Sequence, residues 1–197
     1  MKADRMHKEQ ERYQQMLAYE QQGLQQGFIC LAGIDEAGRG PLAGPVAAAA
    51  CVLDPRRPIY GLNDSKKLTP ASRKRLYQQI IQQSIAWNIS MIGPDIIDRI
   101  NILQATCEAM RQAVSGLSVK PDLLLIDAIR LEGVEQEVWP IIRGDALSVS
   151  IAAASILAKV SRDQLMDEYD QIYPGYGFAQ HKGYGTPAHY DALIKLG

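Results

Sequence analysis

The feature that most constrains the fold is the order of five short apolar segments along the chain. The first two, residues 28–34 and 46–53, are separated by a loop rich in glycine and proline, so we expect them to pair as a hairpin. The other three, residues 86–92, 122–126 and 138–142, alternate with segments of helical periodicity. A hairpin followed by strands that alternate with helices predicts an α/β fold, in which a mixed sheet is flanked by helices.

Helices are expected wherever apolar residues recur every three or four positions behind a capping residue. Thr69 followed by Pro70 marks such a start, because threonine can cap a helix and proline fits its first turn. The first helical segment is polar and rich in glutamine, and we expect it to form an N-terminal extension. The expected helices cover residues 1–27, 70–84, 94–114 and 146–169 and a last segment that begins near Pro187.

Length and composition indicate one globular domain. The chain has 197 residues, of which 47% are hydrophobic, and a net charge of −1. We recognise neither a secretory leader nor an apolar run of the roughly 18 residues that cross a bilayer, so we expect no membrane association. The three cysteines lack metal-ligand spacing, and a reducing cytoplasm is the simplest setting for them. We also expect a monomer. A near-neutral charge does not exclude a nuclease, because an acidic metal site offsets basic residues in the sum.

Four carboxylates lie just beyond the ends of apolar segments: Asp35, Glu36, Asp127 and Asp145. Strands of one sheet can bring such residues together at their ends, where the carboxylates would repel one another unless they bound cations. Oxygen-only ligand sets suit Mg²⁺ or Mn²⁺. Two such ions about 3.5–4 Å apart can activate a water and stabilise the leaving oxygen in phosphodiester hydrolysis. The pattern therefore indicates a two-metal hydrolase site, provided that the acids converge.

Each acid also has a simpler interpretation when it is taken alone. An acidic pair after a strand is most often a solvated turn, which would describe Asp35 and Glu36. Asp127 is as readily a solvated strand end as a ligand. Asp145 precedes an expected helix and could be its N-cap, a role worth about 1 kcal/mol. Spacing in the sequence does not show whether the four residues meet.

The glycine loop after the first strand allows another interpretation. Residues 38–43, Gly-Arg-Gly-Pro-Leu-Ala, fit the G-x-G-x-x-A pattern of dinucleotide-binding enzymes. That pattern has to open a helix, whereas Pro41, Gly44 and Pro45 interrupt this segment and a strand-like run follows. A tight turn between strands is favoured, and a nicotinamide-dependent oxidoreductase is the less favoured alternative. The sequence has no G-x-x-x-x-G-K-[ST] motif, so a P-loop is excluded.

Six short motifs follow one another along the chain: Gly33-Ile34-Asp35-Glu36-Ala37-Gly38-Arg39-Gly40-Pro41, Asp64-Ser65-Lys66-Lys67-Leu68, Ile126-Asp127-Ala128, Gly144-Asp145, the run from Ile151 to Val160 with Arg162-Asp163, and His181-Lys182-Gly183-Tyr184-Gly185-Thr186. In content and order they resemble bacterial ribonuclease HII, of the type 2 ribonuclease H family. The resemblance spans most of the chain. It implies a ribonuclease H-like catalytic domain over residues 28–197, preceded by the helical extension over residues 1–27.

The resemblance also assigns roles to individual residues. The family's four catalytic, metal-binding acids match Asp35, Glu36, Asp127 and Asp145. Its Gly-Arg-Gly loop reads the ribose 2′-hydroxyl through the backbone, which a residue without Cβ can bring close to a sugar. The implied substrate-binding residues are Gly38, Arg39 and Gly40 in this loop, Ser65, Lys66 and Lys67 as phosphate contacts, and Tyr184, which matches the tyrosine that senses the RNA–DNA junction. A packed loop tyrosine and solvated surface lysines are the alternatives.

The activity implied by the resemblance is hydrolysis with Mg²⁺ or Mn²⁺, two ions acting together, that leaves 5′-phosphate and 3′-hydroxyl ends. Its substrates would be the RNA strand of RNA–DNA hybrids and single ribonucleotides embedded in duplex DNA, cut on their 5′ side. This would suit primer removal and ribonucleotide excision repair. A nucleic-acid binding module without catalysis is the alternative. Family members continue beyond the position of Gly197, so we expect a missing C-terminal segment and weakened substrate affinity.

Overall fold

We describe the protein from a computed structural model, which covers the backbone of residues 2–197 and the side chains of residue 4 and residues 6–197. Five strands form one mixed sheet in the order β3-β2-β1-β4-β5. Neighbours are antiparallel from β3 to β1 and parallel from β1 to β5. The strands are β1 (Leu31–Ala37), β2 (Val46–Val52), β3 (Ala86–Ile92), β4 (Leu123–Asp127) and β5 (Glu137–Ile141). The predicted mixed sheet and its opening hairpin are confirmed.

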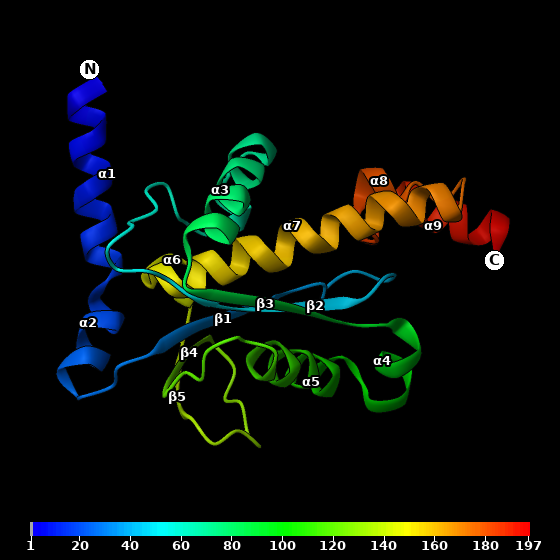
Figure 1. Ribbon diagram of the computed structural model, residues 1–197. Coiled ribbons are helices and arrows are strands. Elements are labelled where there is room, and N and C mark those ends of the chain that lie inside the picture. The colour runs from blue at the N-terminus through cyan, green and yellow to red at the C-terminus, as the bar shows by residue number, and fades with distance from the viewer. Residues whose placement is uncertain (1) are drawn as a thin grey trace.

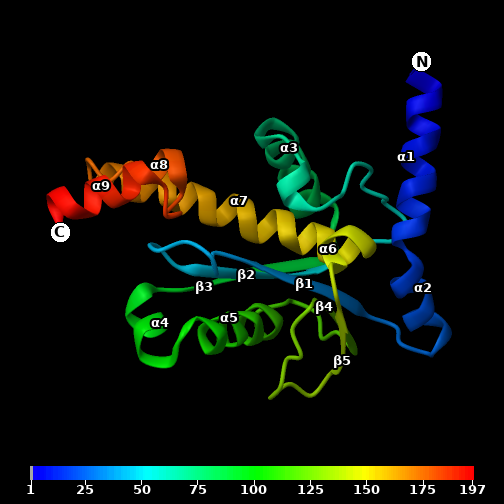
Figure 2. The same ribbon diagram turned by 180° about the vertical axis from the view of Figure 1, so that it is seen from behind.

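Helices cover both faces of this sheet, as two opposite views show (Figures 1 and 2). On one face lie α3 (Pro70–Gln83) and the long α7 (Val149–Ile172), and on the other lie α4 (Pro94–Ile100) and α5 (Ile102–Ser115). β2, with the sequence Val-Ala-Ala-Ala-Ala-Cys-Val, is buried along its whole length between the two layers. Its small side chains let helices pack closely on both faces of the sheet.

The remaining helices lie at the two ends of α7 (Figure 1). α1 and α2 stand beside its N-terminal end together with α6, and α8 and α9 pack at its C-terminal end. Their bounds are α1 (Lys2–Met16), α2 (Ala18–Gln25), α6 (Gly144–Leu147), α8 (Phe178–His181) and α9 (Pro187–Leu196), and a 3₁₀ turn, η1, covers Ser65–Lys67. Within residues 2–197 no helix combines the length and apolar character needed to cross a membrane.

Three helices expected as continuous are each divided in two. The helix expected over residues 94–114 breaks at Asn101, which has a φ of 66° and accepts hydrogen bonds from the first amides of α5. The helix expected over residues 146–169 is α6 followed by α7, with Ser148 at the junction. The N-terminal segment divides near Leu17. A residue that ends one helix and caps the next is compatible with unbroken apolar periodicity, so periodicity did not indicate these breaks.

The first strand ends three residues later than expected. The apolar run stops at Ile34, but β1 continues to Ala37 because Asp35 and Glu36 pair with Ala49 and Ala48 of β2. The interpretation of the two acids as a solvated turn is therefore wrong. The glycine loop leads into β2 rather than into a helix, so it lacks the geometry that a dinucleotide site requires.

Candidate active site

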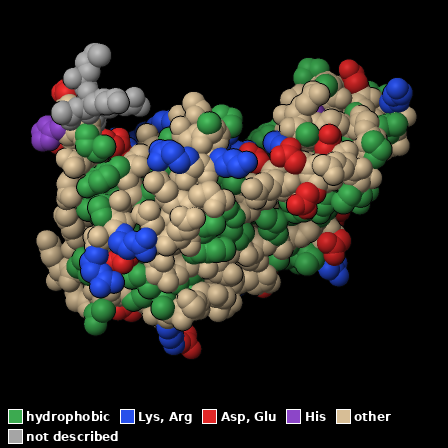
Figure 3. Space-filling view, turned by 45° about the horizontal axis from the view of Figure 1, so that its top comes forward, with side chains coloured by type: hydrophobic (Ala, Val, Ile, Leu, Met, Phe, Trp, Pro, Cys, Tyr) green, Lys and Arg blue, Asp and Glu red, His purple; other side chains and the backbone are tan. Residues whose placement is uncertain are grey.

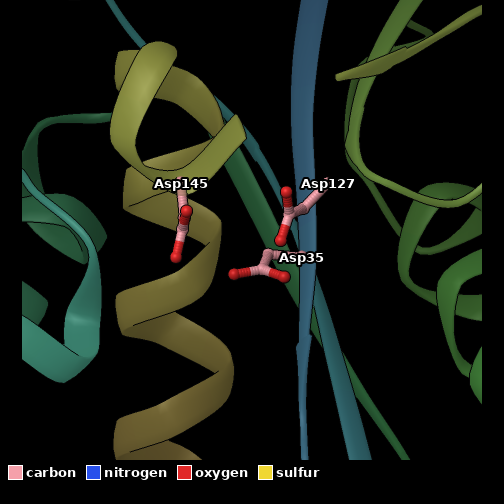
Figure 4. Close-up of side chains that lie close together, drawn as sticks. All are labelled: Asp35, Asp127 and Asp145. Carbon is pink, nitrogen blue, oxygen red and sulfur yellow. The ribbon is translucent and has the colours of Figure 1, made fainter. Parts of the chain in front are cut away.

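Three carboxylates from different parts of the sequence converge at one edge of the sheet (Figure 4). They belong to Asp35 in β1, Asp127 at the end of β4 and Asp145 in α6, and one oxygen of each lies within 4.8 Å of the others. β1 and β4 run parallel with Ile34 opposite Ile126, so the next residue of each strand is an acid. Asp145 approaches from the α6 side (Figure 4).

Gly33 allows this arrangement because it lets α7 lie directly on β1. A Cβ atom at Gly33 would lie only 2.0 Å from the backbone carbonyl carbon of Ser150 and 2.2 Å from its oxygen. Further along α7, Ser155 hydrogen-bonds the carboxylate of Asp35, and its Oγ lies 2.9 Å from Ser65 Oγ, within hydrogen-bonding distance. The contact between helix and strand thus brings β1, α7 and η1 together at the acids.

The segments around Asp127 and Asp145 are tied to each other through Gly144. The backbone amide of Gly144 donates to Asp127 Oδ1 over 2.7 Å. Ala128 and Arg143 have φ values of 53° and 59°, a left-handed conformation that costs a residue with a side chain about 1–3 kcal/mol. Such backbone strain persists only where surrounding contacts impose it, and here it flanks two of the three converging acids.

Asp145 does not have the capping role that its sequence position suggested. It lies inside the first turn of α6, whose N-cap is Arg143, and the long α7 is capped by Ser148. Its side chain is buried and lies within the cluster. The N-cap interpretation is therefore wrong.

The structure does not bring Glu36 into this three-residue group. It follows Asp35 in a strand, so its side chain leaves the opposite face of the sheet. Its Oε1 accepts a hydrogen bond from Arg39 Nη1 over 3.2 Å. Its Oε2 is buried without a hydrogen-bond partner among the described residues. A buried carboxylate oxygen with no donor is a place where a cation would be favoured.

Burial makes negative charge unfavourable at this site. It raises the pKa of Asp35 well above its ordinary value, and repulsion from Glu36 adds to the effect. Burial also raises the pKa of Glu36 and of Asp145, the latter with a further contribution from the neighbouring Asp64. Carboxylates that share a poorly solvated site are best stabilised by cations, and an oxygen-only ligand set fits a hard divalent ion. The residues present therefore fit a divalent-metal site.

The loops expected to contact substrate lie side by side. A Cβ atom at Gly40 would lie 3.6 Å from the ring of Tyr184, and the amide of Leu42 donates to Gly183 O over 2.8 Å. The Tyr184 side chain is 44% exposed, and Lys159 Nζ lies 5.9 Å from the centre of its ring. The glycine loop and this tyrosine therefore form one continuous surface.

Comparison with known proteins identifies the family. The family model of Ribonuclease HII matches residues 32–197. The Ribonuclease HII of Ruminiclostridium cellulolyticum is 54% identical over 190 residues, which cover 96% of this chain and 74% of that protein. The chain belongs to the ribonuclease HII family. The Ribonuclease HII of Desulfitobacterium hafniense is 56% identical over 189 residues, which cover 96% of this chain and 73% of that protein.

The fold of this ribonuclease HII agrees with a solved structure. The ribonuclease H2 of Pyrococcus horikoshii superposes with a TM-score of 0.73 at 29% identity, over 85% of this chain and 86% of that one. The predicted family, the ribonuclease H-like fold and the enzyme class are confirmed. The chain is an endoribonuclease of ribonuclease H type 2 that depends on a divalent metal.

Asp64 is a further acid beside the candidate site, and its sequence context indicated no role for it. Its carboxyl group caps η1 by accepting from the amide of Lys66 over 2.9 Å, and it also lies within hydrogen-bonding reach of Asp145. Asp64 and Asp145 line a cleft of about 470 Å³. The charged residues that line this cleft are Asp64, Lys66, Lys67, Asp127, Arg143 and Asp145. The space-filling view shows Lys and Arg side chains near a concave surface between the body and the α8–α9 end (Figure 3). The only sequence signal for Asp64 was its place in a motif.

Arg162 connects the glycine loop to the loop that carries Tyr184. This arginine is 1% exposed and donates to Pro45 O over 2.8 Å, to Lys182 O over 2.9 Å and to Ala43 O over 3.0 Å. It therefore holds the end of the glycine loop against the loop that carries Tyr184. In the sequence it was only one residue of a motif, because nothing local shows that an arginine will be buried.

The pKa shifts give a prediction for the metal-free protein. A carboxyl group whose pKa is raised by folding binds protons more tightly in the folded state, so stability falls as pH rises from its ordinary pKa through the raised one. For Asp35, Glu36 and Asp145 the free energy of unfolding should therefore decrease from about pH 4 upward. Glu108 has a lowered pKa and acts in the opposite direction, but its side chain is 38% exposed, so solvent screens its charge and its effect on stability is small.

Urea unfolding in EDTA between about pH 4 and pH 8 measures this dependence. Substituting Asp35 with asparagine should flatten the profile, and added Mn²⁺ should stabilise the protein most at the upper end. A free energy of unfolding that rose across this range without metal would show that the acids are not held at raised pKa values.

Proposed function

We propose that this enzyme hydrolyses the RNA strand of RNA–DNA hybrids and cuts on the 5′ side of single ribonucleotides in duplex DNA, leaving 5′-phosphate and 3′-hydroxyl ends. The observation that carries the proposal is the convergence of Asp35, Asp127 and Asp145, of which Asp35 and Asp145 are buried. The glycine loop and Tyr184 lie on a neighbouring continuous surface. Together these features match a site that cleaves a phosphodiester and recognises the sugar next to it.

Asp35, Asp127 and Asp145 would hold the divalent cations. Glu36 would be a fourth ligand, because its carboxyl group, although it leaves the opposite face of β1, lies near enough to Asp127 for their charges to interact. When two such cations, Mg²⁺ or Mn²⁺, are bound, they supply a water nucleophile at neutral pH and stabilise the charge that develops on the leaving oxygen. Ser155 keeps the Asp35 carboxylate in place through its hydrogen bond. The oxygen-only ligand set does not favour one of the two metals.

The other predicted residues would bind the duplex. The backbone at Gly38, Arg39 and Gly40 would contact the ribose 2′-hydroxyl, which distinguishes RNA from DNA. Of the predicted phosphate contacts Ser65, Lys66 and Lys67, the two lysines would bind phosphates, which position a duplex without reading its sequence. Both lysines are exposed at the cleft, while Ser65 is buried and tied to Ser155. The positive charge of Lys66 lies near Glu36 and Asp145 and offsets part of the rise in their pKa values.

The direct test is cleavage of a DNA duplex that contains one ribonucleotide, in Mg²⁺, in Mn²⁺ and in EDTA, with the products mapped at single-nucleotide resolution. We expect one metal-dependent cut on the 5′ side of the ribonucleotide and none in an all-DNA duplex of the same sequence. Binding of both duplexes without any cleavage would instead support a nucleic-acid binding module.

Replacing Tyr184 with alanine is expected to lower kcat/KM on the single-ribonucleotide duplex by about tenfold more than on a uniform hybrid. The exposed ring would pack on the deoxyribose beside the ribonucleotide, and losing about 1.4 kcal/mol of that contact corresponds to a tenfold change. Steady-state kinetics on the two substrates measure the ratio.

Tyr173→Ala is the matched control, because Tyr173 is similarly exposed but lies at the end of α7, where its ring packs edge-on against Tyr169. It should leave the ratio of the two kcat/KM values unchanged. Equal losses on both substrates in Tyr184→Ala would indicate that the tyrosine only packs its own loop.

A further inference from the structure

The N-terminal helices place a buried acid, Glu20, against the start of α7. Glu20 belongs to α2, and its side chain is only 8% exposed. Its Oε1 accepts hydrogen bonds from Ser148 Oγ over 2.5 Å and from the amide of Ser150 over 3.0 Å. Ser148 Oγ in turn accepts from the amide of Ile151 over 3.2 Å. A carboxylate at a helix N-terminus also interacts favourably with the unpaired amides and dipole of the helix.

Ser148 is the joint between α7 and the helix that carries Asp145. Its backbone amide donates to Gly144 O over 2.8 Å, which closes α6 as a single turn, and its side chain caps α7. Gly144 then donates to Asp127 Oδ1. A continuous path of hydrogen bonds therefore runs from Glu20 through Ser148 and Gly144 to Asp127. Asp145 belongs to the helical turn, α6, that the bond between Ser148 and Gly144 closes.

The same helices also contact the loop on the other side of the cleft. Glu9 of α1 accepts a hydrogen bond from the amide of Gly61 over 2.7 Å, in the segment that leads to Asp64. The ring of Tyr13 packs edge-on against Tyr60, with centroids 5.3 Å apart. Two opposite views place α1 and α2 beside α6 (Figures 1 and 2). The N-terminal helices thus contact segments on both sides of the cleft that holds the acids.

We propose that Glu20 is a positioning residue, which fixes the joint at Ser148 and thereby holds Asp145 toward Asp35 and Asp127. This inference rests on the proposed assignment of Asp145 as a metal ligand. α7 already has a side-chain cap in Ser148, so capping alone does not account for a second, buried acceptor at the same helix end. Oε2 of Glu20 is buried without a hydrogen-bond partner among the described residues, a cost that capping alone would not require.

The test compares Mn²⁺ binding, measured without substrate by electron paramagnetic resonance, with kcat and KM on a uniform hybrid. Loss of a residue that orients metal ligands typically lowers metal affinity or activity by about 10–100-fold. We expect Glu20→Ala to lower Mn²⁺ affinity and kcat by about this factor, with little change in KM. Glu20→Gln should restore both to near the wild-type values, because an amide oxygen can accept the same two hydrogen bonds.

Two control variants separate positioning from stability. Met110→Ala removes a buried side chain of α5, on the opposite face of the sheet, so it lowers the melting temperature without touching the joint. It should retain Mn²⁺ affinity and kcat at a temperature well below its melting point. Gln22→Ala changes an exposed neighbour on α2 and should behave as the wild type. If Glu20→Ala does not fold, Ser148→Ala removes the hydroxyl partner of Glu20 and should lower Mn²⁺ affinity in the same direction.

Several results would overturn the inference. The first is wild-type Mn²⁺ affinity in Glu20→Ala, or in Ser148→Ala if Glu20→Ala does not fold. The second is an equal loss of Mn²⁺ affinity and kcat in Met110→Ala at matched stability. The third is failure of Glu20→Gln to restore Mn²⁺ binding. Asp145→Asn distinguishes failure of the proposed role of Glu20 from failure of the proposed metal site. If Asp145→Asn binds Mn²⁺ like the wild type, the metal assignment itself is wrong; if only Asp145→Asn loses affinity, the metal assignment stands and the role of Glu20 falls.

Discussion

Replacing Asp35 with asparagine is expected to slow RNA cleavage by at least about a thousandfold, which corresponds to about 4 kcal/mol of transition-state stabilisation. Asp35 belongs to the group of three converging carboxylates. Repulsion from both Glu36 and Asp127 raises its pKa. Removing its charge would weaken the binding of the cations on which hydrolysis depends. Single-turnover cleavage of a uniform hybrid at saturating Mg²⁺ measures the loss.

The fold should survive this change and become more stable without metal. Asparagine can still accept the hydrogen bond that the Glu36 amide donates over 2.8 Å, and its amide group can donate to Ser155. The buried charge disappears, together with its repulsion from neighbouring acids. Thermal unfolding in EDTA should therefore show a higher midpoint than the wild type. Asp98→Asn, an exposed change on α4, should alter neither quantity.

Near wild-type cleavage by a folded Asp35→Asn variant would contradict the proposed metal site. A lower midpoint in EDTA would contradict only the electrostatic part of the argument, because it would mean that the carboxylate is stabilised by protein contacts rather than destabilised by burial.

Replacing Gly33 with alanine is expected to lower the free energy of unfolding by about 3 kcal/mol or more, the upper part of the range for inserted methyl groups. The new Cβ atom would lie 2.0–2.4 Å from backbone atoms of Ser150 and Ile151. Backbone cannot rotate away as a side chain can, so α7 would have to move off β1. That movement would also separate Ser155 from Asp35. Urea denaturation measures the stability, and Mn²⁺ binding reports the state of the site.

Gly40→Ala is the matched control for this substitution. A Cβ atom there meets only the edge of the Tyr184 ring at 3.6 Å, an ordinary contact distance, and Gly40 does not need a positive φ. Stability should therefore be unchanged in Gly40→Ala. Equal stabilities for wild type, Gly33→Ala and Gly40→Ala would show that α7 does not lie as close to β1 as the structure places it.

Local patterns in the sequence predicted most elements of the fold. Short apolar runs predicted the five strands, and β3 has the predicted bounds. Thr69 caps α3 by accepting from the amide of Ser72, as threonine followed by proline predicted. These features depend on residues within a few positions of one another. The breaks at Asn101 and Ser148 were missed because residues that cap a new helix do not interrupt apolar periodicity.

The candidate site was predicted only in part. Motif order named the acids, but it did not show that Asp35, Asp127 and Asp145 meet while Glu36 leaves the other face of the strand. It also gave no role to Arg162 or Glu20, since a charged residue is expected at the surface unless partners distant in sequence bury it.

The sequence by itself therefore determined the five strands, most of the helices, their order and the family to which the chain belongs. The tertiary structure alone decided which side chains share the site and which positions support it. The reason is physical: strands and helices are specified by contacts between near neighbours, whereas the acid cluster depends on parallel pairing of β1 with β4 and on the approach of α7 at Gly33. Those contacts join residues about a hundred positions apart, and no local pattern records them.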